Sequence, residues 1–110
     1  MKVKNRVKKA QDFQKLIYTG KKFANKSFVF YYKKKQNPEA RVGISISKKI
    51  GHAVERNLYK RQVRMMCQEV IDFNEYEYDI ILIIRFGYKE LNYAENKKNL
   101  EKLVRKSTIK

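Results

Sequence analysis

Residues 79–86, which read DIILIIRF, constrain the fold more than any other stretch because they are apolar at nearly every position. A strand with one solvated face alternates apolar and polar residues, whereas a strand covered on both faces reads as a continuous apolar run. The aliphatic run at residues 80–84 is far shorter than the roughly 20 residues needed to cross a bilayer. The segment therefore predicts a strand covered on both faces, and it is typical of a strand that pairs in parallel.

Three earlier segments predict one short helix and two strands. Residues 12–18 place apolar side chains at helical spacing, and Gly20 follows where a helix would need its C-terminal cap. Residues 27–33 and 41–47 alternate in the manner of strands, and an Asn-Pro turn signal lies between them. With the later segments, these elements predict the order helix, two or three strands, helix, strand, helix.

The second of these strands has one small, polar face. In residues 41–47 (RVGISIS), the aliphatic side chains point one way, while Gly43, Ser45 and Ser47 point the other way. Such a face is either an ordinary solvated face of a sheet or a floor on which another group rests. The sequence leaves both interpretations open.

The last helix is marked by its N-terminal cap. Asn92 can accept a hydrogen bond at the helix start, and Glu95, three residues on, completes a capping box. Leu100, Leu103 and Val104 share one helical face and are expected to be buried. These features predict a C-terminal helix that packs through its aliphatic side chains.

Residues 47–64 (SKKIGHAVERNLYKRQVR) predict a helix from about His52, ending near residues 72–74, whose cations lie on one side. At 3.6 residues per turn, five polar side chains fall within a sector of roughly 140°. They are Arg56, Asn57, Lys60, Arg61 and Arg64. Three apolar side chains, within roughly 40° of one another and outside that sector, are expected to anchor the helix to the sheet. They are Val54, Leu58 and Met65.

The net charge indicates the class of partner. The chain has 27 Lys and Arg against 11 Asp and Glu, which gives a formal charge of +16 on 110 residues. Cationic side chains gain affinity for nucleic acid by displacing its condensed counterions, so a nucleic acid is the expected partner. An anionic membrane surface is the rival, but it predicts large apolar anchors on an amphipathic helix, and the chain has no Trp.

Length and composition favour one domain. Residues 1–110 are 43% hydrophobic and are predicted to form a single nucleic-acid-binding domain, with residues 1–9 as a basic, flexible N-terminal tail. The N-terminal segment lacks the apolar stretch of a secretory signal, and the lone Cys67 excludes an internal disulfide. We therefore expect a cytoplasmic protein that is monomeric when free and has no membrane partner.

The sequence contains no constellation typical of an active site. His52 and Cys67 are the only histidine and cysteine, so a zinc site made from these side chains alone is implausible. An acidic group near the end of the basic helix is interpreted as a solvated turn. Its members are Asp72, Glu75, Glu77 and Asp79. We therefore assign no catalytic residue and no metal ligand to the chain.

Two sets of motifs occur together in one known family. The first set is residues 43–51 (GISISKKIG), followed by Ala53-Val54, Arg56-Asn57 and Lys60-Arg61 with Arg64. The second set is residues 12–15 (DFQK), the Gly20-Lys21 turn, Ala24-Asn25 with Phe28-Val29, and residues 79–83 (DIILI). Over nearly its whole length the chain resembles the bacterial ribonuclease P protein subunit.

The resemblance implies both a fold and a function. The fold would be α+β, an α/β sandwich in the order α-β-β-(β)-α-β-α, with a β-α-β crossover that is left-handed against the usual rule. The function would be that of an accessory subunit of the endoribonuclease ribonuclease P, whose catalytic RNA removes the 5′ leader from precursor tRNA. The implied partners are that catalytic RNA and precursor tRNA, with Mg²⁺ held mainly by the RNA. The alternatives are a generic RNA-binding protein, such as a ribosomal protein or RNA chaperone, and a protein-only nuclease.

The resemblance also assigns roles by position. The basic helix would contact the catalytic RNA, and a cleft between the first helix and the sheet would receive the single-stranded leader. The implied RNA-binding residues are Lys48, Lys49, Arg56, Asn57, Lys60, Arg61 and Arg64. The implied cleft residues are Phe13, Ile17, Tyr31 and Ser45, with Arg61 and Arg64 along the edge. Three positions depart from the family pattern: Leu58 where a further cation is common, His52 where Asn is frequent, and Ile17 where an aromatic residue is frequent.

Overall fold

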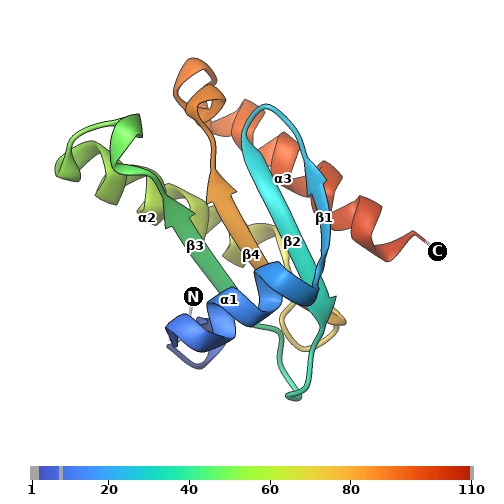
Figure 1. The fold of residues 1–110 in the computed structure, drawn as a ribbon. Helices are drawn as coiled ribbons and strands as arrows, with labels where there is room; N and C mark the ends of the chain where they lie inside the picture. The colour runs from blue at the N-terminus through green and yellow to red at the C-terminus, as the bar shows by residue number, and fades with distance from the viewer. Residues whose placement is uncertain (1–2, 8, 110) are drawn as a thin grey trace.

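In the described residues, 3–7 and 9–109 of a computed structural model, a four-stranded sheet carries one helix on one face and two helices on the other (Figure 1). The helices are α1 (Ala10–Thr19), α2 (Ala53–Val70) and α3 (Tyr93–Thr108). The strands are β1 (Lys21–Ala24), β2 (Phe28–Lys34), β3 (Val42–Ile46) and β4 (Tyr78–Ile84), and short 3-10 helices are η1 (Val3–Asn5), η2 (Lys48–Ile50) and η3 (Phe86–Glu90). The predicted α+β class is confirmed, and β1 is the third strand that the predicted order left optional.

β4 lies in the interior of the sheet, as the apolar run predicts. The strand order is β1-β2-β4-β3, with β4 antiparallel to β2 and parallel to β3. Ile80, Ile81 and Leu82 are fully buried because helices cover the sheet on both sides of them. The predicted parallel pairing is therefore confirmed.

The connection from β3 through α2 to β4 is left-handed. In Figure 1, β3 and β4 both run upward, α2 lies behind the sheet, and β4 lies to the right of β3. A right-handed unit seen from this side would place β4 to the left of β3. The unusual handedness implied by the family resemblance is therefore confirmed.

The core lies between α2, α3 and the face of the sheet that they cover, which we call the inner face. This core includes Phe28, Phe30, Val63, Met66, Cys67, Leu100 and Leu103. Leu100 and Leu103 are buried and Val104 packs against the core, which confirms the predicted face of α3. Two helices of 18 and 16 residues thus cover the inner face.

The predicted anchor of α2 is wrong. Val54 is 81% exposed, Leu58 is 43% exposed and Met65 is 52% exposed. The side chains that α2 buries are centred on Val63 and Cys67, on roughly the opposite side of the helical wheel. Periodicity shows that a helix has an apolar stripe, but only the packing partner determines which stripe is buried. Val54, Leu58 and Met65 instead form an exposed apolar strip of α2.

The predicted N-terminal cap of α3 and the predicted end of α1 at Gly20 are both present, but Gly20 is needed for a different physical reason than the one predicted. Asn92 Oδ1 accepts from the Glu95 N–H at 2.9 Å, and Glu95 Oε1 accepts from the Asn92 N–H at 3.1 Å. Gly20 follows α1 with a φ of −81°, which any residue can adopt. Glycine is needed there for space, because an added Cβ would lie 2.6 Å from the Leu16 carbonyl oxygen and 2.9 Å from that of Tyr32. The end of α1 is therefore held close against β2.

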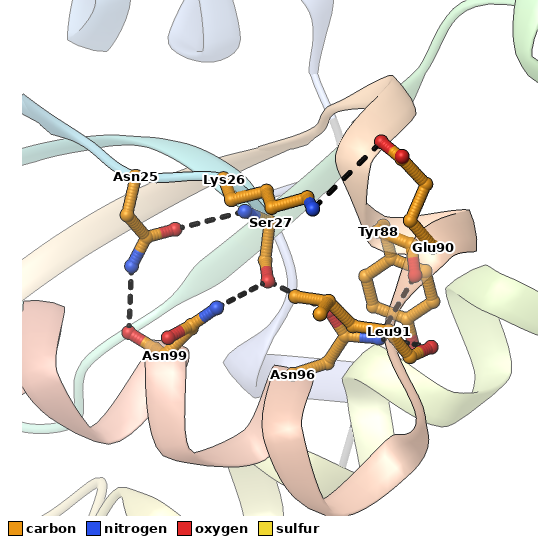
Figure 2. Close-up of polar contacts among 8 residues, drawn as sticks. All are labelled: Asn25, Lys26, Ser27, Tyr88, Glu90, Leu91, Asn96 and Asn99. Carbon is orange, nitrogen blue, oxygen red and sulfur yellow. Dashed lines mark hydrogen bonds and ion pairs between the residues drawn. The ribbon is translucent and has the colours of Figure 1, made fainter.

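A buried polar network ties the turn between β1 and β2 to α3 (Figure 2). Ser27 Oγ donates to Asn96 Oδ1 at 2.6 Å and accepts from Asn99 Nδ2 at 2.8 Å. Asn25 Nδ2 donates to the Asn99 carbonyl at 3.0 Å, and Asn96 Nδ2 donates to the Tyr88 carbonyl at 3.1 Å. Because buried polar groups cost free energy when they lose a partner, this network favours one position of α3 on the sheet.

One member of the predicted acidic turn is buried. Asp79 is 4% exposed and accepts from the Arg41 backbone N–H at 2.8 Å, while its second oxygen pairs with Arg41 Nη2 at 3.2 Å. The interpretation of Asp79 as a solvated residue is therefore wrong, because its carboxylate joins β4 to the start of β3. Asp72, Glu75 and Glu77 are exposed, as expected.

The segment before α1 contacts β3. Asn5 is 3% exposed and its Nδ2 donates to the Ala40 carbonyl at 3.1 Å. The Val7 N–H donates to the Val42 carbonyl at 3.0 Å. Residues 1, 2 and 8 of the expected tail lie outside the described residues, and the flexibility of residues 1–9 stays a prediction.

Candidate nucleic-acid interface

The other face of the sheet, which we call the outer face, is only partly covered. α1 crosses it near one end of the strands, beginning beside β3 and ending beside β2 (Figure 1). The next row of outer-face side chains, aligned by the strand register, is Ser45 of β3, Ile83 of β4 and Val29 of β2. All three are half-buried, so a strip of the sheet stays accessible along the side of α1.

Phe13 forms the α1 side of this strip at β3. Its ring rests on Gly43, since an added Cβ at Gly43 would lie 2.8 Å from the ring and 2.6 Å from Ile81 Cδ1. Gly43 is therefore a floor for another side chain rather than a solvated position, which resolves the two interpretations of that face at this residue. Ile17 lies one turn after Phe13 on α1 and is half-buried. Tyr31 is paired with Ile81, so it lies on the row of Gly43, two strands away.

A hollow at the edge strand β3 joins the outer face to α2. Phe13 and Ser45 line it from the outer face, and Lys60 lines it from α2. The other lining residues are Lys9, Ala10, Gln14, Ile44 and Ile46. Because β3 is at the edge of the sheet, a side chain of a helix on the inner face can reach the outer face here. Two cleft residues and one residue of the basic helix therefore meet at a single site.

The remaining expected cleft residues do not line this hollow. Ile17, Arg61 and Arg64 lie outside it, and Tyr31 lies farther across the sheet, where Lys22 Nζ is 5.9 Å from the centre of its ring. Arg61 is exposed on α2, and Arg64 is half-buried. The expected cleft thus consists of a hollow at β3 and a separate aromatic and cationic pair at β2.

Most of the expected RNA-binding side chains of α2 occupy one flank of the helix. Asn57, Lys60, Arg61 and Arg64 lie between the buried stripe and the exposed apolar strip of α2, whereas Arg56 shares the angular position of the buried Val63 and Cys67 near the helix start. Arg56 Nε donates to the Gly51 carbonyl at 3.1 Å, which closes the turn before the helix, while Asn57 is exposed. Among the described residues, no ion pair to a carboxylate forms at Arg56, Lys60, Arg61 or Arg64, nor at Lys48 and Lys49 of η2. The flank therefore carries uncompensated positive charge.

The opposite flank of α2 is acidic and docked on α3. Glu69 accepts from Lys97 Nζ at 2.6 Å and from the Tyr93 hydroxyl at 2.9 Å. These two hydrogen bonds, with that from Lys97 the larger cause, lower the pKa of Glu69. Gln62 accepts from the Tyr88 hydroxyl at 2.7 Å on the same side. Only the flank away from α3 is therefore available to an anionic partner.

The sequence reasoning missed three apolar side chains of the outer face and its edge. Val29 and Ile83 form the floor of the open strip. The alternation of β2 places Val29 on the face of Tyr31, whereas the continuous apolar run of β4 carries no such signal for Ile83. Phe86, expected within the last strand, instead begins η3 and is 62% exposed. Lys89 Nζ lies 5.7 Å from the centre of its ring.

The described side chains do not form a metal or nucleophile site. Among residues 3–7 and 9–109 there is no group of three or more His, Cys, Asp or Glu that could hold a metal ion. Burial raises the pKa of the Cys67 thiol to about 12, so this thiol stays protonated at neutral pH. Within the same residues, none of the helices has the length and apolarity required to cross a membrane.

The fold and this surface define a class of small, basic α+β proteins in which a left-handed β-α-β unit places a cationic helix beside a partly open sheet face. The family model described as Ribonuclease P matches residues 1–108. The chain belongs to the bacterial ribonuclease P protein component family.

Individual relatives agree with this family over nearly the full chain. The ribonuclease P protein component of Bacillus pumilus is 44% identical over 110 residues, which are 99% of this chain and 92% of that protein. The solved RNase P protein of Staphylococcus aureus superposes with a TM-score of 0.82 at 32% identity, covering 96% of each chain. That of Thermotoga maritima has a TM-score of 0.79 at 27% identity, covering 92% of this chain and 96% of that one.

Proposed function

We propose that this chain assists the catalytic RNA of ribonuclease P in the endonucleolytic removal of the 5′ leader from precursor tRNA by binding both RNAs. Family membership makes it the protein component of the ribonuclease P ribonucleoprotein enzyme, which acts in tRNA processing with the RNase P RNA. The observation that carries the finer proposal is the hollow at β3, where Lys60 meets Phe13 and Ser45. One continuous surface there offers a cation for a phosphate and an aromatic ring for a base.

The single-stranded leader would lie along the open strip of the outer face. Single strands bind in cationic grooves that contain aromatic platforms, and each stacked base contributes about 1–3 kcal/mol. Phe13 and Tyr31 are half-buried, so their rings are held in place and still present surface to a base. Lys60 at one end of the strip and Lys22 beside Tyr31 would bind phosphates of the same strand.

The cationic flank of α2, with η2 before it, would bind the catalytic RNA. Arginine side chains such as Arg61 and Arg64 form paired hydrogen bonds to phosphate oxygens, which isolated ammonium groups cannot do. The exposed Asn57 can both donate and accept, which suits ribose hydroxyls and base edges. Lys48 and Lys49 extend the same positive surface beyond the helix start.

In this proposal the RNA performs the cleavage. The described side chains form no group of three or more metal-ligating residues; in this proposal Mg²⁺ is held mainly by RNA phosphates, and no catalytic residue is assigned to the protein. The protein would raise the affinity for substrate and reduce the repulsion between two polyanionic RNAs. A cytoplasmic location, shared with the precursor tRNA, belongs to the same proposal.

A reconstitution at low magnesium tests the proposal against its alternatives. The purified chain is added to precursor tRNA with and without the cognate catalytic RNA, and removal of the 5′ leader is measured. Cleavage that requires both components is expected. Cleavage by the chain alone would instead indicate a protein-only nuclease, and no effect under either condition would indicate a generic RNA-binding protein.

A paired substitution tests the division of labour. Lys22→Gln/Lys60→Gln, which removes the two cations proposed to bind the leader, is expected to raise the apparent Kd for precursor tRNA and to leave the single-turnover cleavage rate at saturation unchanged. The slope of log affinity against log salt should fall by about 0.7 for each lost contact to a single strand. Lys15→Gln/Lys34→Gln removes the same charge from other exposed positions and serves as the control. A slower cleavage step with intact binding would contradict the proposal.

A further inference from the structure

A second group of exposed cations lies on α3. It consists of Lys98, Lys102, Arg105 and Lys106, and we call it the α3 cationic surface. On a helical wheel these side chains fall within a sector of roughly 100° on the side opposite the buried Leu100 and Leu103. The helix therefore buries one side in the core and presents a continuous row of positive charge to solvent.

The charges of this surface are only partly offset by an acid, since Glu101 lies at its margin, four residues before Arg105. None of its four side chains forms an ion pair with a described carboxylate, whereas the adjacent Lys97 pairs with Glu69 at 2.6 Å. Lys98 and Lys102 are four residues apart, as are Lys102 and Lys106, and like charges at this spacing destabilise a helix. Glu101 offsets part of this repulsion at Arg105, but two like-charge pairs remain along the surface.

Helix stability accounts for only two of the four cations of this surface. Arg105 and Lys106 occupy the last turn, where cations interact favourably with the helix dipole, and Lys106 Nζ lies 4.5 Å from the centre of the Phe23 ring. Lys98 and Lys102 lie in the middle of the helix, where the dipole effect has faded. A chain with a net charge of +16 does not need them for solubility. These two lysines therefore require a different explanation.

The helix that carries the α3 cationic surface lies toward the opposite edge of the sheet from α2. α2 packs beside β3 and α3 reaches β1 through Lys106 and Phe23, and these strands are the two edges of the sheet (Figure 1). Between the helices, Glu69 of α2 is engaged by Tyr93 and Lys97 of α3. An RNA strand that ran from one cationic surface to the other would therefore cross this neutralised pair rather than free cations, so the two surfaces suit separate RNA segments.

We propose that the α3 cationic surface binds the phosphate backbone of double-stranded RNA, so that the protein bridges two RNA segments. The charges of Lys98 and Lys102 follow each other by about 6 Å along the helix axis, and lysine ammonium groups bind phosphates as point charges without reading bases. Duplex RNA suits such a surface because it presents its backbone and ribose hydroxyls rather than readable base edges. Ile109, beyond the helix, is 71% exposed, but one aliphatic side chain does not anchor a helix to a membrane.

The number of short RNA duplexes bound per chain tests this proposal. Native mass spectrometry of the full chain is expected to show two duplexes for the wild type and one for Lys98→Gln/Lys102→Gln, in which glutamine preserves helix propensity. The control Lys15→Gln/Lys34→Gln, which has the same net charge as that variant, should still bind two. Lys98→Arg/Lys102→Arg keeps the charges and should also bind two. A single duplex on the wild type, or two on the glutamine variant, would overturn the proposal.

A second measurement covers the case in which the glutamine variant does not fold. If the glutamine variant does not fold, as judged by circular dichroism, lysine acetylation of the wild type replaces it: duplex binding should protect Lys98 and Lys102, and unchanged reactivity would overturn the proposal. The proposal extends the function proposed above, but neither duplex measurement requires catalytic RNA, so the two can fail independently.

Binding measurements with the RNAs of the ribonucleoprotein identify which RNA supplies the duplex, the catalytic RNA or the precursor tRNA. Weaker binding of the glutamine variant to catalytic RNA alone would place the duplex there, and a raised apparent Kd of the holoenzyme for precursor tRNA would place it in the substrate. In either case the salt slope should fall by about 1.4 to 1.8 for two lost phosphate contacts. An unchanged slope with both RNAs would show that the bridge does not form in the enzyme.

Discussion

The inner and outer faces of the sheet carry similar side chains, but helices cover the inner face far more completely than the outer face. Phe30 and Tyr31 are neighbours on β2, yet Phe30 is fully buried beneath α2 and α3, while Tyr31 is half-buried on the face of α1. Two long helices exclude water from the inner face, whereas α1, with 10 residues, leaves part of the outer face accessible. The comparison indicates that the inner face supplies most of the buried core, whereas the outer face leaves apolar surface accessible, where we propose that the leader binds.

The largest effect is expected on the inner face. Phe30→Ala should lower the free energy of unfolding by about 3–5 kcal/mol, because it removes a fully buried ring and leaves a cavity between sheet and helices. Urea denaturation followed by circular dichroism measures the change. The neighbouring substitution Tyr31→Ala should cost clearly less stability, and an equal or larger loss at Tyr31 would break the division between the faces.

The second effect concerns binding at the outer face. Tyr31→Ala should weaken the binding of a single-stranded leader oligonucleotide by about 5- to 150-fold, because one stacked base loses its platform. Fluorescence anisotropy at fixed salt measures the Kd. Tyr18→Ala is the matched control. It removes a tyrosine of α1 that is 92% exposed, and it should leave the affinity unchanged. Equal effects of the two substitutions would remove Tyr31 from the cleft.

A smaller effect is expected on the solvent side of α2. Leu58→Arg should leave the free energy of unfolding within about 0.5 kcal/mol of wild type, because Leu58 is 43% exposed and not part of the core. If the catalytic RNA lies on this surface, the added cation should steepen the salt dependence of its binding by a slope of about 0.9. Leu58→Gln, which adds no charge, should not steepen it. A strong loss of stability in both variants would restore Leu58 as an anchor.

The smallest effect is a pH dependence at the junction of α2 and α3. The hydrogen bonds from Lys97 and Tyr93 lower the pKa of Glu69, so the folded state favours its carboxylate more than the unfolded state does. The resulting stabilisation is present above the unfolded pKa, about 4.3, and is lost as pH falls through the lower folded value. Glu69→Gln should therefore be less stable than wild type at pH 7, with a difference that shrinks in acid. A pH-independent difference at Glu69 would contradict this assignment.

The sequence was sufficient for features that depend on local pattern. The apolar run of β4, the alternation of β2 and β3, and the cap formed by Asn92 and Glu95 all predict the elements that the structure contains. These signals follow from side-chain spacing and from hydrogen bonds between residues close in sequence, so they need no knowledge of the rest of the chain. The handedness of the crossover came from the family resemblance, because the general rule for such units predicts the opposite hand.

The sequence was insufficient where distant segments decide the outcome. The helical wheel of α2 contains an apolar strip at Val54 and Leu58 and another centred on Val63, and periodicity alone cannot choose between them. Asp79 looks like part of an acidic turn until β3 brings Arg41 against it.

The sequence by itself therefore determined the element types, their order, the excess of positive charge and the family to which the chain belongs. Only the tertiary structure decided that Phe13 rests on Gly43 and that Lys60 reaches the hollow of Phe13 and Ser45. It also decided that α2 and α3, with their cations, lie toward opposite edges of the sheet. The physical reason is that these relations join residues far apart in sequence, and they are set by strand order and by which face each helix covers rather than by local spacing.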